Sequence, residues 1–337
     1  MESKPPKVPP RNPAADASIG MAALGYCLPA TRRSLAELRA DGLLTGSAET
    51  LASFGFAYAH VANGETNLEM AADAARRVLR ESATDPSEIG LLLYATALTG
   101  SATMAGASDR DSVLRLDSVA ESFQYPASCL QAELELTRAT VAGVDQQGCA
   151  SLLSALRIGR AMLVAEPALG AVLCVSADVF PARAPRDLVY NVISDGACAV
   201  LLKHGAPNRI LSCAQVTKGS YWDAAALEHE VIAAYFPTAK NLIMEALSIA
   251  GLELDDISLV IPHNVSRRSW DILCGLLKLP ADRVYTDNIA RVGHTIAADN
   301  ILNLRDAIDS GRVARGDKLL LFTFGFGLNW SCIVVQH

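Results

Sequence analysis

The sequence has no excess of positive charge: 29 Lys and Arg stand against 36 Asp and Glu, for a net charge of −7. A nucleic-acid-binding protein needs a basic surface, so the charge balance argues against that class. No apolar run approaches the roughly 18 residues that a membrane span needs. The N-terminal stretch MESKPPKVPPRNPAAD has no apolar core of a signal peptide. We therefore expect residues 1–18 to be a disordered lead-in and the protein to be cytoplasmic, with no membrane partner.

The sequence also lacks the cysteine pattern of a metal site or a disulfide framework. Its eight cysteines contain no CxxC pair and follow no regular spacing, and there are only six histidines. Most of the cysteines lie in apolar or Ala-rich runs, as expected for buried reduced thiols of a cytosolic protein. We expect no metal site and no cofactor.

What the sequence does contain is apolar residues and an internal repeat. Of its 337 residues, 51% are hydrophobic and 19% are charged, which is typical of a globular protein with a large core. Residues 67–98 and residues 241–265 both begin Asn-Leu-x-Met. Each then continues as a predicted amphipathic helix of about four turns, an acidic turn and an apolar strand.

A second pair of segments repeats in the same order. Residues 144–180 and residues 287–327 each run from a loop through a helix to an apolar strand, GAVLCVSADVF or KLLLFTFGFG. Strands that alternate with helices predict parallel sheets, and unbroken apolar strands predict helices on both faces. We therefore expect an N-terminal half over 19–205 and a C-terminal half over 206–337.

The two loop-to-helix junctions align in this repeat. Gly148-Cys149 in the first half corresponds to Gly293-His294 in the second. The start of a helix offers unpaired amides and the positive end of the dipole, which favour a thiolate. Cys149 is therefore a candidate nucleophile. The alternative is an ordinary buried thiol.

Five motifs, in this order, resemble the thiolase-like superfamily and most closely its β-ketoacyl-acyl-carrier-protein synthase III branch. They are DQQGCASLLSALRIGRAML around Cys149, SADVF with ISDGACAVLL, IPHNVSRR around His263, GHTIAADN around His294, and the closing GRVARGDKLLLFTFGFGLNW. The resemblance covers about residues 19–337. It implies an α/β fold in which two pseudo-symmetric halves form a layered α-β-α-β-α sandwich, and it implies an acyltransferase.

The resemblance also implies roles for particular residues. Cys149 takes an acyl group from a thioester as an acyl-enzyme. The backbone amides of Cys149 and Phe326 form the oxyanion hole, although Phe326 stands where the family has glycine. His263 polarises the carbonyl of the second thioester or acts as a base. The alternative for His263 is a core histidine at a strand end.

His294 departs from the family pattern, because the branch usually has Asn at this position. A neutral histidine can donate the hydrogen bond that an Asn amide donates, and it can also take up a proton. His294 is therefore compatible with decarboxylation and also with general-base transfer to an alcohol or amine. The remaining alternative is drift in a protein that has lost its activity.

The region that binds coenzyme A in the family also differs. Where the family has a Trp and an Arg around the adenine, this sequence has Glu49 and Ser53, so a carrier-bound donor is favoured. Arg267 and Arg268 are candidates for binding the acidic face of an acyl carrier protein or the pantetheine arm. The alternative for both arginines is a solvated helix start. Residues 99–128 are longer than in ordinary family members and predict a surface elaboration.

The sequence leaves three functions open. The first is decarboxylative Claisen condensation of an acyl thioester with a malonyl-type extender in fatty-acid-like or specialised-metabolite biosynthesis. The second is transfer of the acyl group to oxygen or nitrogen. The third is an inactive partner subunit of an active condensing enzyme. The expected partners are acyl carrier protein or coenzyme A thioesters and a second subunit, identical or related, in a dimer.

Overall fold

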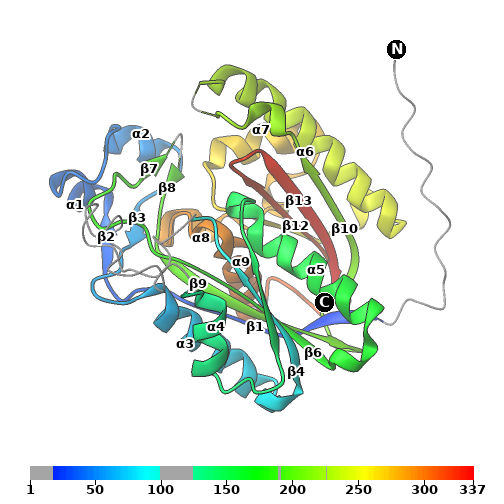
Figure 1. Ribbon diagram of the computed structural model, residues 1–337. Coiled ribbons are helices and arrows are strands. Elements are labelled where there is room, and N and C mark those ends of the chain that lie inside the picture. Colours follow the sequence, from blue (N-terminus) through cyan, green and yellow to red (C-terminus); the bar gives the residue numbers. More distant parts are fainter. Residues whose placement is uncertain (1–17, 99–123, 189–190, 225) are drawn as a thin grey trace.

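The computed structural model describes residues 18–98, 124–188, 191–224 and 226–337 (Figure 1). Within these residues a nine-stranded sheet has the order β11-β12-β13-β10-β1-β9-β6-β4-β5. Its first group contains β1 (Ile19–Cys27), β4 (Ile89–Ala95), β5 (Thr140–Val144), β6 (Ala171–Asp178) and β9 (Gly196–His204). Its second group contains β10 (Arg209–Thr217), β11 (Leu259–Pro262), β12 (Lys318–Gly325) and β13 (Asn329–Gln336). A single register pair, Gly20 with Arg209, joins the groups through β1 and β10.

Helices form the other layers. Figure 1 shows α5 (Ser151–Ala165) between the two groups of strands, with α3 (Asn67–Glu81) and α4 (Pro126–Glu133) outside the first group. α6 (Glu228–Ala250) and α7 (Arg267–Leu277) cover the second group. α5 contacts β4, β6 and β13, and α9 (Asp299–Asp309) contacts β1 and β11, so both helices touch both groups of strands. The layered α-β-α-β-α fold expected from the sequence is confirmed.

The smaller elements lie mostly on one side of the layers. They include α1 (Leu35–Ala40), α2 (Ala48–Ser53), α8 (Asp287–Arg291) and two small two-stranded sheets. One sheet pairs β2 (Arg32–Ser34) with β3 (Tyr58–His60), and the other pairs β7 (Asp187–Leu188) with β8 (Asn191–Val192).

The two groups of strands repeat the same local order. β4 is parallel to β6, and β11 is parallel to β12. β9 and β13 then return antiparallel to β6 and β12. The expectation of parallel sheets therefore holds for β4 with β6 and β11 with β12, but β9 and β13 are antiparallel to their neighbours. The described residues between β6 and β9, and those between β12 and β13, contain no crossover helix, and strands joined without a crossover run antiparallel.

The repeated helices differ in length. α3 begins where the sequence predicts, because Thr66 and Glu69 form a reciprocal cap at its N-terminus. α6 instead begins at Glu228, well before the predicted start near residue 241, and continues through Pro237. Proline removes one backbone donor but does not always end a helix. The longer helix brings residues 231–236 towards the site described below.

The strand β6 shows why an unbroken apolar run forms a central strand. All eight of its residues are buried, because α3 covers one face and α5 covers the other. The proposed boundary between the halves falls in the turn between β9 and β10. The division into domains at residues 205 and 206 stays a prediction, and residues 1–17 of the predicted lead-in lie outside the described residues.

One helical stretch among the described residues, Gly148–Ala165, is long and apolar enough by length and composition to cross a membrane. Half of it is buried inside the protein, and α5 makes up most of it. Its position between the two groups of strands explains its apolar composition, since it is the helix at the centre of the core.

Candidate active site

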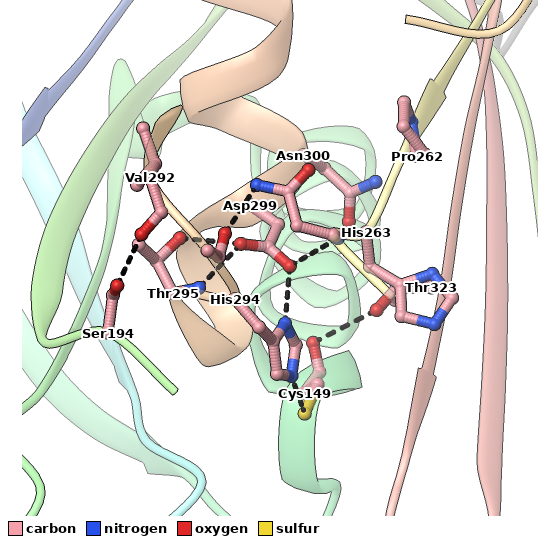
Figure 2. Close-up of polar contacts among 12 residues, drawn as sticks. Cys149, Ser194, Pro262, His263, Val292, His294, Thr295, Asp299, Asn300 and Thr323 are labelled. Carbon is pink, nitrogen blue, oxygen red and sulfur yellow. Dashed lines mark hydrogen bonds and ion pairs between the residues drawn. The ribbon is translucent and has the colours of Figure 1, made fainter. Parts of the chain in front are cut away.

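The candidate nucleophile lies on a tight loop before the central helix. Cys149 is in the 3-10 turn η5 (Gly148–Ala150), which runs directly into α5. Gly148 has φ +52, and a Cβ there would lie 2.7 Å from the backbone nitrogen of Phe326, so the loop needs glycine. The Sγ of Cys149 lies 3.2 Å from Nε2 of His294 (Figure 2). The two junctions that align in the sequence repeat therefore meet in space.

A carboxylate that the sequence did not reveal, that of Asp299, contacts the ring nitrogen of His294 that does not face Cys149. Figure 2 shows His294 between Cys149 and Asp299, and its Nδ1 lies 2.5 Å from Oδ2 of Asp299. That oxygen also accepts from the amide of Asn264 at 2.6 Å. The other oxygen, Oδ1, accepts from the amide and the hydroxyl of Thr295, both at 2.7 Å. The side chains of Cys149, His294 and Asp299 form one continuous chain.

The charges of Asp299 and His294 stabilise each other. Burial alone would raise the pKa of the Asp299 carboxyl, but His294 and the three hydrogen-bond donors outweigh it and lower that pKa. Burial alone would likewise lower the pKa of His294, but the Asp299 carboxylate and then the Cys149 thiolate raise it well above its ordinary value. An imidazolium is therefore favoured beside a thiolate and a carboxylate.

His263 has a different environment from His294. It follows β11, is 1% exposed, and has a pKa lowered to about 3, first by burial and then by the neighbouring His294. Neither of its ring nitrogens has a hydrogen-bond partner among the described residues. The rings of His263 and His294 are 6.3 Å apart between centroids. His294, and not His263, is thus the hydrogen-bond partner of Cys149, while His263 is a neutral imidazole beside it.

Buried amides fix the strand end that carries His263. Asn300 donates to the carbonyls of Ile261 and Phe322 at 2.9 and 3.0 Å. Asn303 donates to the carbonyl of Pro262 at 2.8 Å and to the side chain of Asn264 at 2.8 Å. Both amides project from α9, the helix that also carries Asp299. One helix therefore positions both histidines.

The two amides predicted to form an oxyanion hole lie side by side. A Cβ on Gly325 would be 2.1 Å from the carbonyl oxygen of Gln147 and 2.7 Å from the nitrogen of Cys149, so the two loops are in contact. Phe326 is not among the non-glycine residues with positive φ, and Gly327 takes the left-handed conformation instead, at φ +85. A side chain at position 326 is therefore accommodated without backbone strain.

The two candidate arginines have different surroundings. Arg268 lines the cavity that contains Cys149. Arg267 instead packs against Gly55, where a Cβ would lie 2.8 Å from its side chain, and its amide donates to the carbonyl of Phe54. Glu49 and Ser53 lie on α2, which ends at Phe54. Most of the long segment 99–128 falls outside the described residues.

A cavity of about 580 Å³ extends over the candidate nucleophile. Cys149, His263 and His294 all line it, and most of its other lining residues are apolar. Phe180 and Ile193 form part of one wall. A buried ion pair fixes the backbone at Phe180, because the guanidinium of Arg186 binds both oxygens of Asp195 at 2.9 Å and Asp195 also accepts from the Phe180 amide at 2.7 Å.

The cysteines divide into two groups. All eight are free, and Cys174, Cys198, Cys274 and Cys332 are buried, as the sequence predicts for structural thiols. Cys27, Cys129, Cys149 and Cys213 are partly exposed. Burial raises the pKa of the Cys174 thiol. In the described part of the chain no group of three or more His, Cys, Asp and Glu side chains is placed to hold a metal ion.

Asp299 is the main site residue that sequence reasoning missed. It stands at the first position of α9, where an acidic residue is common because it stabilises the helix dipole. The available signal was the spacing His-x4-Asp across a loop-to-helix junction. The spacing is informative only once His294 is known to point back at the start of its own following helix.

Comparison with known proteins agrees with this fold. Residues 247–337 match the family model of the 3-oxoacyl-[acyl-carrier-protein] synthase III C-terminal region. The chain is 29% identical to a β-ketoacyl-[acyl-carrier-protein] synthase III of Sphingopyxis alaskensis over 322 residues, covering 93% of this chain and 97% of that one.

Solved structures show the same fold. The 3-oxoacyl-[acyl-carrier-protein] synthase III of Aquifex aeolicus is 24% identical, with a TM-score of 0.78, and the match covers 95% of this chain and 100% of that one. ChlB3, described as an acyltransferase, is 24% identical with a TM-score of 0.82, covering 95% and 97%. These likenesses show that the chain shares the fold of the 3-oxoacyl-[acyl-carrier-protein] synthases III. In sequence it is similar to β-ketoacyl-[acyl-carrier-protein] synthases III over most of its length.

Proposed function

We propose that this protein transfers an acyl group from a thioester to a second substrate through an acyl-enzyme on Cys149. The observation that carries the proposal is the chain of contacts from Sγ of Cys149 through His294 to Asp299. A nucleophile in contact with a base, and a base oriented by a third group, is the arrangement of covalent acyl-transfer catalysis.

In the first half-reaction the Cys149 thiolate attacks the thioester carbonyl carbon. The C–S bond to the donor breaks, and the donor thiol leaves with the proton from His294. We propose that the amides of Cys149 and Phe326, whose loops are in contact, donate to the negative oxygen of the tetrahedral intermediate. The result is a neutral thioester on Cys149, and one of the charges that raise the pKa of His294 is then gone. His294 becomes able to accept a proton from the next substrate.

Decarboxylative condensation is the first candidate for the second half-reaction. It agrees with the similarity to β-ketoacyl synthases III. A malonyl-type thioester loses carbon dioxide, and the resulting enolate carbon attacks the acyl group and releases the Cys149 thiolate. The enolate oxygen needs neutral hydrogen-bond donors. His263 supplies one, since its pKa of about 3 keeps it neutral and its ring nitrogens have no partner among the described residues.

Transfer to oxygen or nitrogen is the second candidate, and one specific observation favours it. Asp299 is buried and bonded to Nδ1 of His294, which fixes the tautomer that accepts a proton at Nε2. Deprotonation of a hydroxyl or amine by such a histidine typically contributes about 10²–10⁴-fold. A decarboxylating enzyme needs no base at this position, whereas a transferase does.

The donor and the assembly are part of the proposal. Carrier-protein and coenzyme A thioesters are the donor class, with Arg268 at the cavity and Arg267 beside Phe54 as the positive groups that meet an acidic carrier. We propose that the protein works without a metal or cofactor and as a homodimer or with a related subunit. Light scattering that gives a stable monomer at micromolar concentration would contradict the dimer.

The decisive experiment measures both half-reactions on the His294→Asn variant. Intact-mass spectrometry follows acylation of Cys149 by a panel of acyl thioesters, and product analysis follows condensation or transfer. If the enzyme condenses, the variant keeps a substantial fraction of malonyl decarboxylation, because Asn donates a similar hydrogen bond. If it transfers to oxygen or nitrogen, acylation slows because His294 no longer gives its proton to the donor thiol, but the acyl-enzyme still accumulates because the transfer step falls about 10²–10⁴-fold.

The unmutated protein and the Cys149→Ala variant are the controls. An adduct on the first and none on the second supports the acyl-enzyme. A protein that takes no acyl group from any thioester would instead be the inactive partner subunit. An adduct that water removes without an acceptor would identify a thioester hydrolase.

A further inference from the structure

Aromatic residues are scarce in this protein but concentrate around the candidate nucleophile. They make up 6% of the sequence, which contains eight phenylalanines. Five of those eight line the cavity over Cys149, together with one tyrosine: Phe54, Phe180, Tyr235, Phe236, Phe324 and Phe326. These residues come from segments far apart in the sequence, so chain neighbourhood does not explain why they meet.

The rings form a connected wall. Tyr235 meets Phe236 and Phe324 edge-on, with centroids 4.9 and 5.1 Å apart. Phe324 continues the row to Phe326, at 6.2 Å. Such a wall presents both ring faces and ring edges to the cavity, and edge-to-face or offset contacts are the geometry in which a further ring binds best.

The cavity is too large for a small acyl group alone. Its volume of about 580 Å³ lies within the range of roughly 300–1,000 Å³ that holds drug-sized ligands. Three further apolar lining residues, Leu188, Ile232 and Ile272, are 41%, 39% and 42% exposed, so the apolar lining extends to the surface. An apolar group can thus pass from solvent to Cys149 along an apolar path.

One ring of the aromatic wall carries a polar group, the hydroxyl of Tyr235. Tyr235 is half-buried and lines the cavity, and burial raises the pKa of its phenol. A bound ring with a polar substituent would find a hydrogen-bonding group in this wall.

We infer that the substrate of this cavity carries an aryl group, either as the acyl group itself or on the acceptor. The inference rests on the proposed function, since the cavity is defined by Cys149. The shared chemistry is a planar apolar ring within reach of the aromatic wall, and the two sources differ only in which half-reaction the ring enters.

The test compares ring pairs of equal size that differ in aromaticity. For the donor arm, acylation of Cys149 by benzoyl and by cyclohexanecarbonyl coenzyme A is measured by intact mass, with acetyl coenzyme A as the small reference. For the acceptor arm, the acetyl-enzyme is chased with benzylamine or cyclohexylmethylamine. We expect one arm to favour the aryl member by about 3- to 10-fold, the effect of an aromatic pair.

Variants locate the preference in the wall. Phe180→Leu and Phe236→Leu keep an apolar side chain but remove a ring, and each should lower the ratio of the aryl rate to the cyclohexyl rate. Phe56→Leu is the control, because Phe56 is a buried phenylalanine that does not line the cavity. It should leave the preference unchanged.

A readout without turnover keeps this inference separable from the proposed function. Benzamide and cyclohexanecarboxamide are compared for protection of Cys149 from iodoacetamide. If no thioester acylates Cys149 but benzamide protects several-fold better, the proposed function is wrong and the aryl site stands. If acylation occurs but aryl and cyclohexyl members agree within about twofold in both arms and in protection, the aryl site is overturned.

Discussion

The two loop-to-helix junctions of the site, Gly148–Ala165 and Gly293–Asp309, share one plan. Each begins with a glycine of positive φ, +52 at Gly148 and +82 at Gly293. Each then gives a reactive side chain, a 3-10 turn and a helix buried between the two groups of strands. The reactive atoms of the two junctions, Sγ and Nε2, lie 3.2 Å apart.

The buried contents of the two helices are different. α5 buries mainly leucine, with Ser151 and Ser154 as its buried polar residues. α9 buries Asp299, Asn300 and Asn303 beside its leucines. The first junction therefore presents the nucleophile on a mostly apolar helix, and the second supplies a charge and hydrogen bonds next to it. The two junctions share their geometry but differ in their chemistry.

The largest effect should come from removing the nucleophile. Cys149→Ala should lower acyl transfer by at least about 10⁴-fold, since the covalent step has no other thiol within reach of His294. Cys129→Ala is the control, because Cys129 is also partly exposed but does not line the cavity. Activity assays on both variants measure the contrast.

The same assignment predicts chemical labelling. Stoichiometric iodoacetamide followed by peptide mapping should modify Cys149 before the other partly exposed thiols, because Cys149 lines the cavity and its Sγ contacts His294. Preferential labelling of any other cysteine would remove the assignment of Cys149 as nucleophile.

The next largest loss of activity should come from replacing Asp299, whose charge has no counterpart in the first junction. Asp299→Asn keeps the shape but lets an amide N–H face Nδ1 of His294, so transfer should fall by about 10²–10⁴-fold. Asp178→Asn is the matched control in the first half. Asp178 is also buried and accepts from Thr96 and from the Ala97 amide, but it does not contact the histidine. A comparable loss in both variants would contradict the orienting role of Asp299.

A smaller effect should separate the two histidines by pH. His263→Ala should lower the rate by about 10²–10³-fold, the usual result of losing one oxyanion-type donor. The shape of the pH–rate profile should not change between about pH 5 and 9, because the pKa of His263 is already lowered to about 3. If one limb of the pH–rate profile disappears in this variant, His263 titrates in catalysis.

The same shift gives a stability prediction with a definite sign. Between pH 3 and 6.5 unfolded His263 binds a proton that the folded protein excludes. Its contribution to stability is therefore complete above about pH 6.5 and is lost as the pH falls towards 3. Urea unfolding at pH 5 and pH 7 should show a smaller acid sensitivity for His263→Ala than for the unmutated protein.

The smallest effects should come from the glycines that give the junctions their common plan. Gly148→Ala and Gly293→Ala each force a left-handed alanine against backbone, at 2.7 Å from the Phe326 nitrogen and 2.9 Å from the Val192 oxygen. We expect each to lower the free energy of unfolding by about 2–3 kcal/mol. Gly42→Ala has the same positive φ but no atom within 4 Å, and should cost only about 1 kcal/mol. Equal costs in denaturant unfolding would show that the close approach of the loops is unimportant.

The sequence by itself determined the repeat, the order of the elements and the residues Cys149, His263 and His294. The repeat was visible because apolar periodicity and turn residues act locally along the chain. The start of α6 was misplaced because no local signal marks Glu228, and the mixed direction of the strands was missed because strand direction depends on how β9 and β13 return.

Only the tertiary structure decided which histidine meets the thiol. The resemblance implied that His263 polarises a carbonyl or acts as a base. His263 is buried without a partner among the described residues, and its pKa falls to about 3 for that reason. His294 contacts Asp299 because the first turn of α9 lies against the histidine ring. The aromatic wall likewise exists only after folding, since Phe54, Phe180 and Phe324 are distant in sequence. Local patterns specify helices and strands, whereas burial, charge pairing and cavity walls are properties of residues brought together by the whole fold.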